Sequence, residues 1–192
     1  MKLRGLYALT PESVAMGQVQ AALEGGLALL QYRSKKRDLD EAREIAALAR
    51  RYGVPLIVND DVELALEIGA DGAHLGREDG DLAAARRRLA GKLLGASCYN
   101  DRELACKAVR AGADYVAFGS VFASPTKPRA VRAPLALFNQ DLGVPLCAIG
   151  GITLENAPQV IAAGADLLAV ITDLFDRPDI ARRAAEFGRL FK

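Results

Sequence analysis

The sequence predicts a compact α/β fold, a single-domain barrel of eight parallel strands in which each strand is followed by a helix or a helical turn. Three observations support this prediction. Short apolar runs recur along the 192 residues, and they number eight, about one per 24 residues. The runs are continuous rather than alternating, as in parallel strands that are covered on both faces. The tripeptide Gly-Ala-Asp, beginning at Gly69, Gly112 and Gly164, each time separates a helical pattern from such a run.

The predicted strands lie at residues 3–9, 27–30, 55–58, 72–75, 93–97, 115–118, 144–149 and 167–171. The glycine before several of them ends the preceding helix, because glycine adopts a left-handed conformation at little cost. A doubly wound open sheet is the alternative architecture. The barrel is preferred because the units number eight and no G-x-G-x-x-G sequence follows the first strand. We therefore predict a (β/α)8 barrel over residues 1–192.

Several helices of the barrel can be predicted together with their starts. Residues 38–52 show the clearest amphipathic pattern. Thr10 followed by Pro11 predicts an N-cap with a proline in the first helical position. Asn100 with a glutamate three residues later resembles a capping box, and a further helix is expected to start near Thr153. Residues 133–141 leave room for at most two helical turns, so the sixth helix is expected to be shortened.

Composition and charge exclude several classes of protein. The 25 basic and 24 acidic residues give a net charge of +1, so the chain has no strong field to attract nucleic acid or anionic lipid. No apolar run reaches the ~18 residues of a membrane span, and the N-terminus does not resemble a secretory signal. The three cysteines match neither a disulfide framework nor a zinc site. We expect a cytoplasmic enzyme or binding protein that acts on small molecules.

In barrels of this type, the active site lies at the carboxyl ends of the strands. Polar and glycine residues gather there in this sequence. They are Gln31, Arg33 and Lys35 after the second strand, Asn59 and Asp60 after the third, Asp79 after the fourth, Ser97 after the fifth, Ser124, Thr126 and Lys127 after the sixth, Gly150 and Gly151 after the seventh, and Ile171 and Thr172 after the eighth. This gathering predicts a functional site at one rim of the barrel.

Two of the carboxylates predict a metal site. Asp60 and Asp79 follow adjacent strands, so their side chains are expected to share one hard cation. Carboxylate oxygens without nitrogen or sulfur neighbours favour Mg²⁺. Asp61 is expected to cap the following helix instead of binding the metal.

The basic and glycine residues predict two anion sites on the same rim. Arg33, Lys35 and Lys127 would repel one another without a multiply charged ligand, and beside Mg²⁺ they indicate a diphosphate. Gly150 and Gly151 lie where this fold commonly binds a monophosphate through bare backbone N–H groups, and the eighth strand completes that site.

No Ser-His-Asp or Cys-His set can be assembled from these residues. His74, the single histidine, is expected to be a packed or positioning residue. Charge clamps without an acid–base pair suit the displacement of a leaving group that is already good, such as diphosphate.

The motifs at these strand ends resemble those of the thiamine phosphate synthase family over nearly the whole chain. The matching segments are Gln31-Tyr32-Arg33-Ser34-Lys35, residues 58–65, His74-Leu75-Gly76-Arg77-Glu78-Asp79, Ser124-Pro125-Thr126-Lys127 and residues 148–152. Two positions depart from the family pattern: Arg77 replaces a glutamine, and Thr172 replaces a serine while keeping the hydroxyl.

The resemblance implies a transferase that joins 4-amino-2-methyl-5-(diphosphooxymethyl)pyrimidine to a thiazole phosphate and releases diphosphate. It assigns the pyrimidine diphosphate to Gln31, Arg33, Lys35, Asn59, Ser97 and Lys127, the metal to Asp60 and Asp79, and the thiazole phosphate to Ser124, Thr126, Gly150, Gly151, Ile171 and Thr172. Lys35, Ser97 and Lys127 would be the catalytic groups. It also implies a Mg²⁺ cofactor and a homodimer.

Two other functions share the fold. A thiazole tautomerase would carry a catalytic histidine where Ser120 stands here, and it would lack much of the metal and lysine set. A regulatory barrel that binds thiamine phosphate without catalysis would have no reason to keep the metal pair. Lys35, Asp60, Asp79 and Lys127 therefore favour the synthase.

Overall fold

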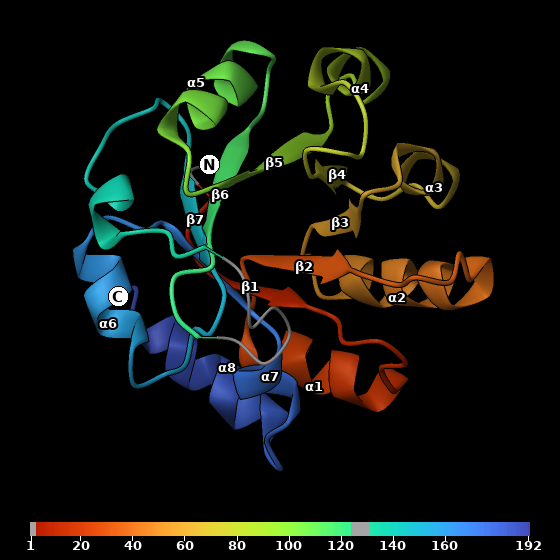
Figure 1. Cartoon of the computed structure of the whole chain (residues 1–192). Helices are drawn as coiled ribbons and strands as arrows, with labels where there is room; N and C mark the ends of the chain where they lie inside the picture. Colours follow the sequence, from red (N-terminus) through yellow and green to blue (C-terminus); the bar gives the residue numbers. More distant parts are fainter. Residues whose placement is uncertain (1–2, 124–130) are drawn as a thin grey trace.

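The computed structural model describes residues 3–123 and 131–192, and it places eight parallel strands in one closed barrel in sequence order (Figure 1). The strands are β1 Gly5–Leu9, β2 Leu29–Tyr32, β3 Leu56–Asn59, β4 Gly72–Leu75, β5 Leu93–Tyr99, β6 Tyr115–Gly119, β7 Leu146–Ile149 and β8 Leu167–Val170. The predicted (β/α)8 barrel is confirmed, and the open sheet is excluded because β1 pairs with both β2 and β8.

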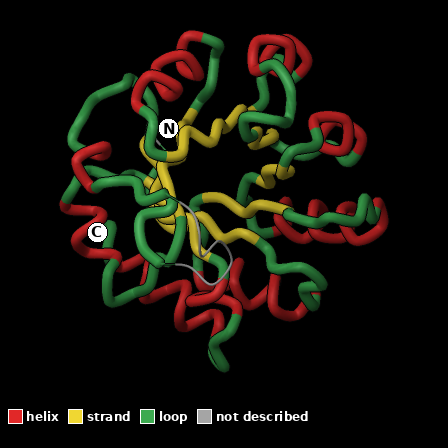
Figure 2. The backbone as a smooth tube through the Cα atoms, viewed as in Figure 1, coloured by secondary structure: helices red, strands yellow, loops and turns green. Residues whose placement is uncertain are grey.

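The helices form an outer ring around the strands (Figure 2). They are α1 Met16–Gly25, α2 Leu39–Arg51, α3 Val62–Glu67, α4 Leu82–Arg88, α5 Arg102–Arg110, α6 Ala157–Ala162, α7 Thr172–Phe175 and α8 Ile180–Arg189. Between β6 and β7 the described residues contain only a 3-10 turn, η1 Leu135–Phe138, so the sixth helix of the barrel is shortened as predicted. None of the described helices is long and apolar enough to cross a membrane.

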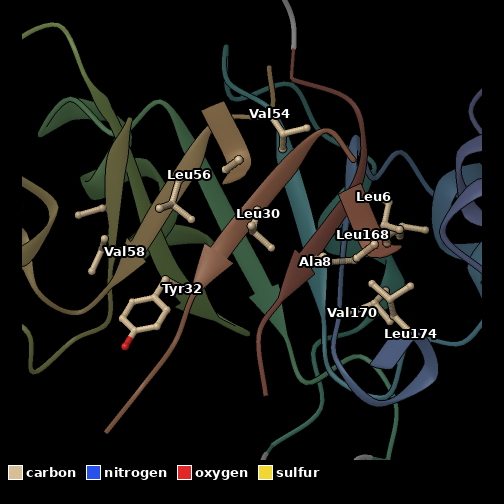
Figure 3. Packing of buried hydrophobic residues seen from close by; sticks show 14 of the residues in the cluster. Leu6, Ala8, Leu30, Tyr32, Val54, Leu56, Val58, Leu168, Val170 and Leu174 are labelled. Atoms are coloured by element: carbon tan, nitrogen blue, oxygen red, sulfur yellow. The ribbon is translucent and has the colours of Figure 1, made fainter. Parts of the chain in front are cut away.

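Side chains alternate between the two faces of the closed sheet, as the pleat of a strand requires. One set points out toward the helices and forms the larger core, which includes Leu6, Leu30 and Leu56 (Figure 3). The other set, which includes Tyr7 and Tyr115, forms a smaller cluster within the barrel. The inward positions nearest the carboxyl ends of the strands form the floor of the functional site.

Aspartates begin most of the helices. The side chains of Asp38, Asp61, Asp81, Asp101 and Asp179 accept hydrogen bonds from backbone N–H groups three residues later. The capping role predicted for Asp61 is confirmed. Asn100 is not the cap of α5, because the carboxylate one residue later accepts from Leu104 N at 3.0 Å.

The predicted helix start at Thr10 and Pro11 is wrong, since α1 begins at Met16. Thr10 instead extends the pairing of β1 with β2. Its N–H donates to Gln31 O at 2.9 Å, and its hydroxyl accepts from Arg33 N at 2.9 Å. A residue held in this way to the neighbouring strand cannot start a helix.

The helix expected near Thr153 begins later, at Ala157. Thr153 and Asn156 first form a turn, in which Thr153 N donates to Asn156 Oδ1 at 2.9 Å and Asn156 N donates to Thr153 Oγ1 at 3.3 Å. Pro158 then lies in the first turn of α6, where its missing N–H costs no hydrogen bond.

Candidate functional site

A cavity of about 560 Å³ opens at the carboxyl ends of the strands. Its lining includes every described residue of the predicted site except Lys35: Gln31, Arg33, Asn59, Asp60, Asp79, Ser97, Gly150, Gly151, Ile171 and Thr172. Lys35 lines an adjoining cavity of about 420 Å³, which shares Asn59, Asp60 and Asp79 with the first. The structure thus brings these residues together. Ser124, Thr126 and Lys127 lie outside the described residues.

Asp60 and Asp79 form an acidic pair at the mouth of the cavity. Asp60 has a positive φ of 63° directly after β3, and its Oδ2 accepts from Asn59 Nδ2 at 2.5 Å. Asp79 Oδ2 accepts from Gly76 N at 2.7 Å. Partial burial, and then the neighbouring Asp79 carboxyl, raise the pKa of Asp60 to about 6. The Asp79 carboxyl is therefore close enough to disfavour the charge of Asp60.

This donor set fits Mg²⁺. Two neighbouring carboxylates repel each other, and a shared cation removes this repulsion. Both carboxylates also offer the hard oxygen ligands that Mg²⁺ prefers. Among the residues the structure describes, no three His, Cys, Asp or Glu side chains gather to hold a metal by themselves. Further ligands would have to come from water or from substrate oxygens, which is the usual arrangement for Mg²⁺.

Basic side chains flank the acidic pair. Arg33 is half-buried, and its positive charge partly opposes the rise in the pKa of Asp60. Lys35 is exposed, and its backbone N–H donates to Glu12 Oε2 at 3.4 Å. Arg77, one of the departures from the family pattern, places its guanidinium 4.9 Å from the centre of the Tyr99 ring, and both residues line the larger cavity.

Gly150 and Gly151 lie on the opposite side of the mouth, after β7. Both have positive φ, 97° and 63°. A Cβ on Gly150 would lie 2.1 Å from Ser120 Oγ, and one on Gly151 would lie 2.2 Å from Ala123 O. No side chain fits at either position, so the backbone itself faces the cavity.

The short helix α7 completes this side of the cavity, beginning with Thr172 directly after Ile171. Within this helix, the buried Asp173 accepts from Leu154 N at 2.8 Å and from Arg183 Nη2 at 2.7 Å. These bonds tie α7 to the loop after β7. Sequence reasoning missed Asp173, because Leu154 and Arg183 lie 19 and 10 residues away from it in the chain.

The floor of the cavity holds a continuous chain of hydrogen bonds. Gln31 Nε2 donates to Tyr7 Oη at 2.6 Å, and the hydroxyls of Tyr7 and Tyr115 lie 2.8 Å apart. His74 Nδ1 lies 3.0 Å from Tyr115 Oη, and its Nε2 lies 2.9 Å from Ser97 Oγ.

The pair of Ser97 and His74 is not a catalytic triad. A tyrosine hydroxyl stands where a triad has a carboxylate, and burial lowers the pKa of His74 to about 4. An imidazole with so low a pKa is a weak base at neutral pH. The histidine is thus buried and bonded on both sides, which agrees with its predicted packed or positioning role.

Comparison with known proteins gives a consistent result. A family model described as thiamine monophosphate synthase matches residues 6–174. A protein of Aromatoleum aromaticum named thiamine-phosphate synthase is 61% identical over 99% of this chain and 97% of its own length. Its namesake in Thiobacillus denitrificans is 53% identical over 97% of this chain and 94% of its own.

A solved structure agrees with these matches. The structure of thiamine phosphate pyrophosphorylase from Pyrococcus furiosus superposes with a TM-score of 0.88 and 32% identity, covering 99% of this chain and 96% of that one. The resemblance seen in the sequence motifs and the expectation of a transferase are both confirmed. The chain belongs to the thiamine monophosphate synthase family.

Proposed function

We propose that this chain joins 4-amino-2-methyl-5-(diphosphooxymethyl)pyrimidine to hydroxyethylthiazole phosphate or its carboxylated form, giving thiamine phosphate and diphosphate. The observation that carries the proposal is that one cavity is lined by two groups of residues suited to binding anions, one on each side of the closed barrel. The acidic pair and Arg33 lie beside β2, β3 and β4. The two glycines and Thr172 lie beside β7 and β8.

In this proposal, Arg33, Lys35, Asn59 and Lys127 bind the diphosphate, and Gln31 binds the pyrimidine. Ser97 lies near the reacting carbon. Ser124 and Thr126 contact the thiazole, and its phosphate binds to Gly150, Gly151, Ile171 and Thr172. The lining of the cavity supports this division. Charged side chains suited to a diphosphate lie on one side, and glycines whose backbone N–H groups suit a monophosphate lie on the other.

The bond between the methylene carbon and the diphosphate oxygen breaks, and a new bond forms between that carbon and the thiazole nitrogen. The amino group of the pyrimidine donates electrons to the developing methylene cation, so ionisation precedes attack. The basic residues hold the charge that grows on the leaving oxygen. The attacking nitrogen carries no proton, so this chemistry requires no strong base, in keeping with the weakly basic His74.

Asp60 and Asp79 would hold Mg²⁺. When bound, this ion supplies positive charge to the diphosphate oxygens. The support is the oxygen-only donor set and the raised pKa of Asp60.

The test is to mix both phosphorylated precursors with the protein, with and without Mg²⁺, and to measure thiamine phosphate and diphosphate. We expect equal amounts of the two products, and only with the metal. Isomerisation of a thiazole phosphate without condensation would point to the tautomerase instead. Binding of thiamine phosphate without turnover would point to a regulatory barrel.

We also propose that the protein is a cytoplasmic homodimer that contacts its partner through the helical shell. The phosphorylated substrates are too highly charged to cross a membrane. This supports a location of the enzyme in the cytoplasm, where the substrates would be made. Sedimentation of the 20.4 kDa chain at twice this mass would support the dimer, and a monomer at micromolar concentration would contradict it.

A further inference from the structure

The hydrogen-bond chain in the cavity floor contains three side chains that have no role in the reaction as proposed above. It joins Gln31 on β2 to Ser97 on β5 through three buried side chains, those of Tyr7, Tyr115 and His74. Four bonds of 2.6 to 3.0 Å therefore cross the barrel from one predicted substrate-binding residue to another.

The first bond favours one direction for the chain, in which each hydroxyl donates to the next group. Since Gln31 Nε2 donates to the Tyr7 hydroxyl, the Tyr7 proton is free to point to Tyr115, whose own proton then points to His74 Nδ1. The imidazole is buried and its two nitrogens face hydroxyl groups rather than a carboxylate, so it is neutral and carries one proton. In this direction that proton lies on Nε2, where it donates to Ser97 Oγ.

This direction of the chain fixes the orientation of the Gln31 amide, because its Nε2 must face Tyr7. One N–H group of the amide donates to Tyr7 Oη. The other N–H group and the carbonyl oxygen remain to bind a ligand. In the part of the chain that the structure describes, no buried side-chain oxygen or nitrogen lacks a partner, and Oε1 of Gln31 has no protein partner. Oε1 is therefore open to the cavity that Gln31 lines.

Gly95 makes room for the central bond of the chain. A Cβ at this position on β5 would lie 2.3 Å from Tyr115 Oη and 2.5 Å from His74 Nδ1. Any larger residue would push the two groups apart. The absence of a side chain at this position of β5 therefore allows the hydrogen bond between Tyr115 and His74.

We propose that Tyr7, Tyr115 and His74 are positioning residues that fix the amide of Gln31 in one orientation, so that the site accepts a 4-aminopyrimidine and rejects its 4-oxo counterpart. This inference rests on the proposed function. The fixed amide offers an acceptor beside a donor, and the amino group and adjacent ring nitrogen of the substrate offer the complementary donor and acceptor. The 4-oxo ring presents the reverse order and would need the amide to turn over.

The first experiment reads the proton on the imidazole and needs no substrate. Since the chain has one histidine, a long-range ¹H–¹⁵N spectrum of uniformly labelled protein at pH 7 assigns its tautomer without any mutation. We expect a protonated Nε2 and an unprotonated Nδ1. A proton on Nδ1 would reverse every bond of the chain and overturn the proposal, whether or not the protein makes thiamine phosphate.

The second experiment measures specificity by binding. The ligands are the monophosphate of 4-amino-5-hydroxymethyl-2-methylpyrimidine and its 4-oxo analogue, which lack the reactive diphosphate, and calorimetry gives both dissociation constants. The wild type is expected to prefer the amino ligand by about 100-fold or more, and Tyr7→Phe should reduce this preference at least about tenfold because the amide can then turn.

Two further variants complete this experiment. Tyr115→Phe breaks the next bond of the chain, so it should lower the preference in the same way. Tyr52→Phe removes a surface hydroxyl that bonds Glu24, so it should leave the preference unchanged. Thermal unfolding of each variant checks that it is folded, and an unchanged preference in both folded floor variants would overturn the proposal. Absence of condensation in a wild type with the expected tautomer would contradict the proposed reaction instead.

Discussion

The mouth and the floor of the cavity are built from the same strands but use different chemistry. At the mouth, Lys35, Asp60 and Asp79 are charged groups exposed to water. One layer deeper, Tyr7 and His74 are buried and neutral, and each is bonded to its neighbours. Burying a charge without a partner costs several kcal/mol, so charges stay where water solvates them until a ligand arrives.

This difference separates two tasks. Exposed charges recognise the number and charge of phosphate groups, but they are adaptable and weakly selective for shape. A buried network whose hydrogen bonds all run in one direction presents its free donor and acceptor in a fixed order, so it recognises the order of donors and acceptors on a ring. The predictions below test whether the two layers act independently.

The largest effect is expected at the acidic pair of the mouth. Asp79→Asn keeps an oxygen that can accept from Gly76 N but removes the charge. We expect kcat/KM to fall by roughly 1,000-fold and the response to Mg²⁺ to disappear, because metal assistance is worth several kcal/mol. Steady-state kinetics over a Mg²⁺ titration measures both.

Asp40→Asn is the matched control, since its carboxylate lies on the outer surface of α2. It should leave the kinetics unchanged. A wild-type Mg²⁺ requirement in Asp79→Asn would remove this residue from the metal site, while the assignment of the floor would stand.

Next in size is the effect of a methyl group on the glycine side of the mouth. In Gly151→Ala the new Cβ would meet Ala123 O at 2.2 Å, so the backbone must move. We expect KM for the thiazole phosphate to rise about tenfold, as for a phosphate that loses one backbone hydrogen bond worth ~1.5 kcal/mol or more. KM for the pyrimidine diphosphate should change little.

Gly143→Ala separates strain from contact. Gly143 also has a positive φ, 76°, but a Cβ there has nothing within 4 Å. Gly143→Ala should lose ~1 kcal/mol of stability from the backbone conformation alone, with both KM values unchanged. Equal KM values in the two variants would mean that the phosphate does not bind at Gly151.

Salt should affect the two layers unequally. Raising the ionic strength from about 0.05 to 0.5 M shortens the screening length from well above to below 10 Å. KM for the pyrimidine diphosphate should rise roughly three- to tenfold, whereas the preference for the amino over the oxo ligand should stay constant. A preference that falls in parallel with affinity would show that the layers are not independent.

The smallest effect is expected from pH in the neutral range. The pKa of His74 is lowered from 6.5 to about 4 by burial, so the unfolded chain binds a proton between these values that the folded chain does not. Stability linked to this group is therefore complete above pH 6.5 and falls as the pH drops toward 4, by at most ~1.4 kcal/mol per unit.

Urea unfolding of the wild type and of His74→Gln, which cannot titrate, isolates this contribution as a difference between the two proteins. The imidazole signals of the wild type should not titrate between pH 8 and 5.5. A midpoint near 6.5 would place the histidine in contact with water and would contradict the neutral floor.

Much of the barrel could be predicted from sequence because its signals are local. A glycine that stops a helix and a following apolar run are adjacent in the chain, so all eight strands were found. The proximity of Asp60 and Asp79 could be predicted from the order of the strands alone, because the two residues follow neighbouring strands. Thr10 misled the prediction, because a threonine before a proline has the same sequence whether it caps a helix or extends a strand.

The floor network could not be found in this way. Tyr7, His74 and Tyr115 belong to strands that are not neighbours in the chain, and each looks like an ordinary buried residue on its own. One signal was available: these residues share the inward parity of Gln31 and Ser97 along their strands. Using it requires the register between strands, which depends on the closure of the barrel.

The aspartate caps also make the ring of helices electrically uneven. Helices α2 to α5 each begin with a carboxylate that offsets the partial positive charge of the helix start. Helices α6 and α7 have no such cap, and Asp173 in the first turn of α7 is neutralised by Arg183. Helix α1 also begins without a carboxylate, but of the helices that follow β7 and β8 both α6 and α7 keep the partial positive charge of their starts. On the side of the barrel where we propose that the monophosphate binds, the helix starts would therefore attract an anion before any side chain touches it.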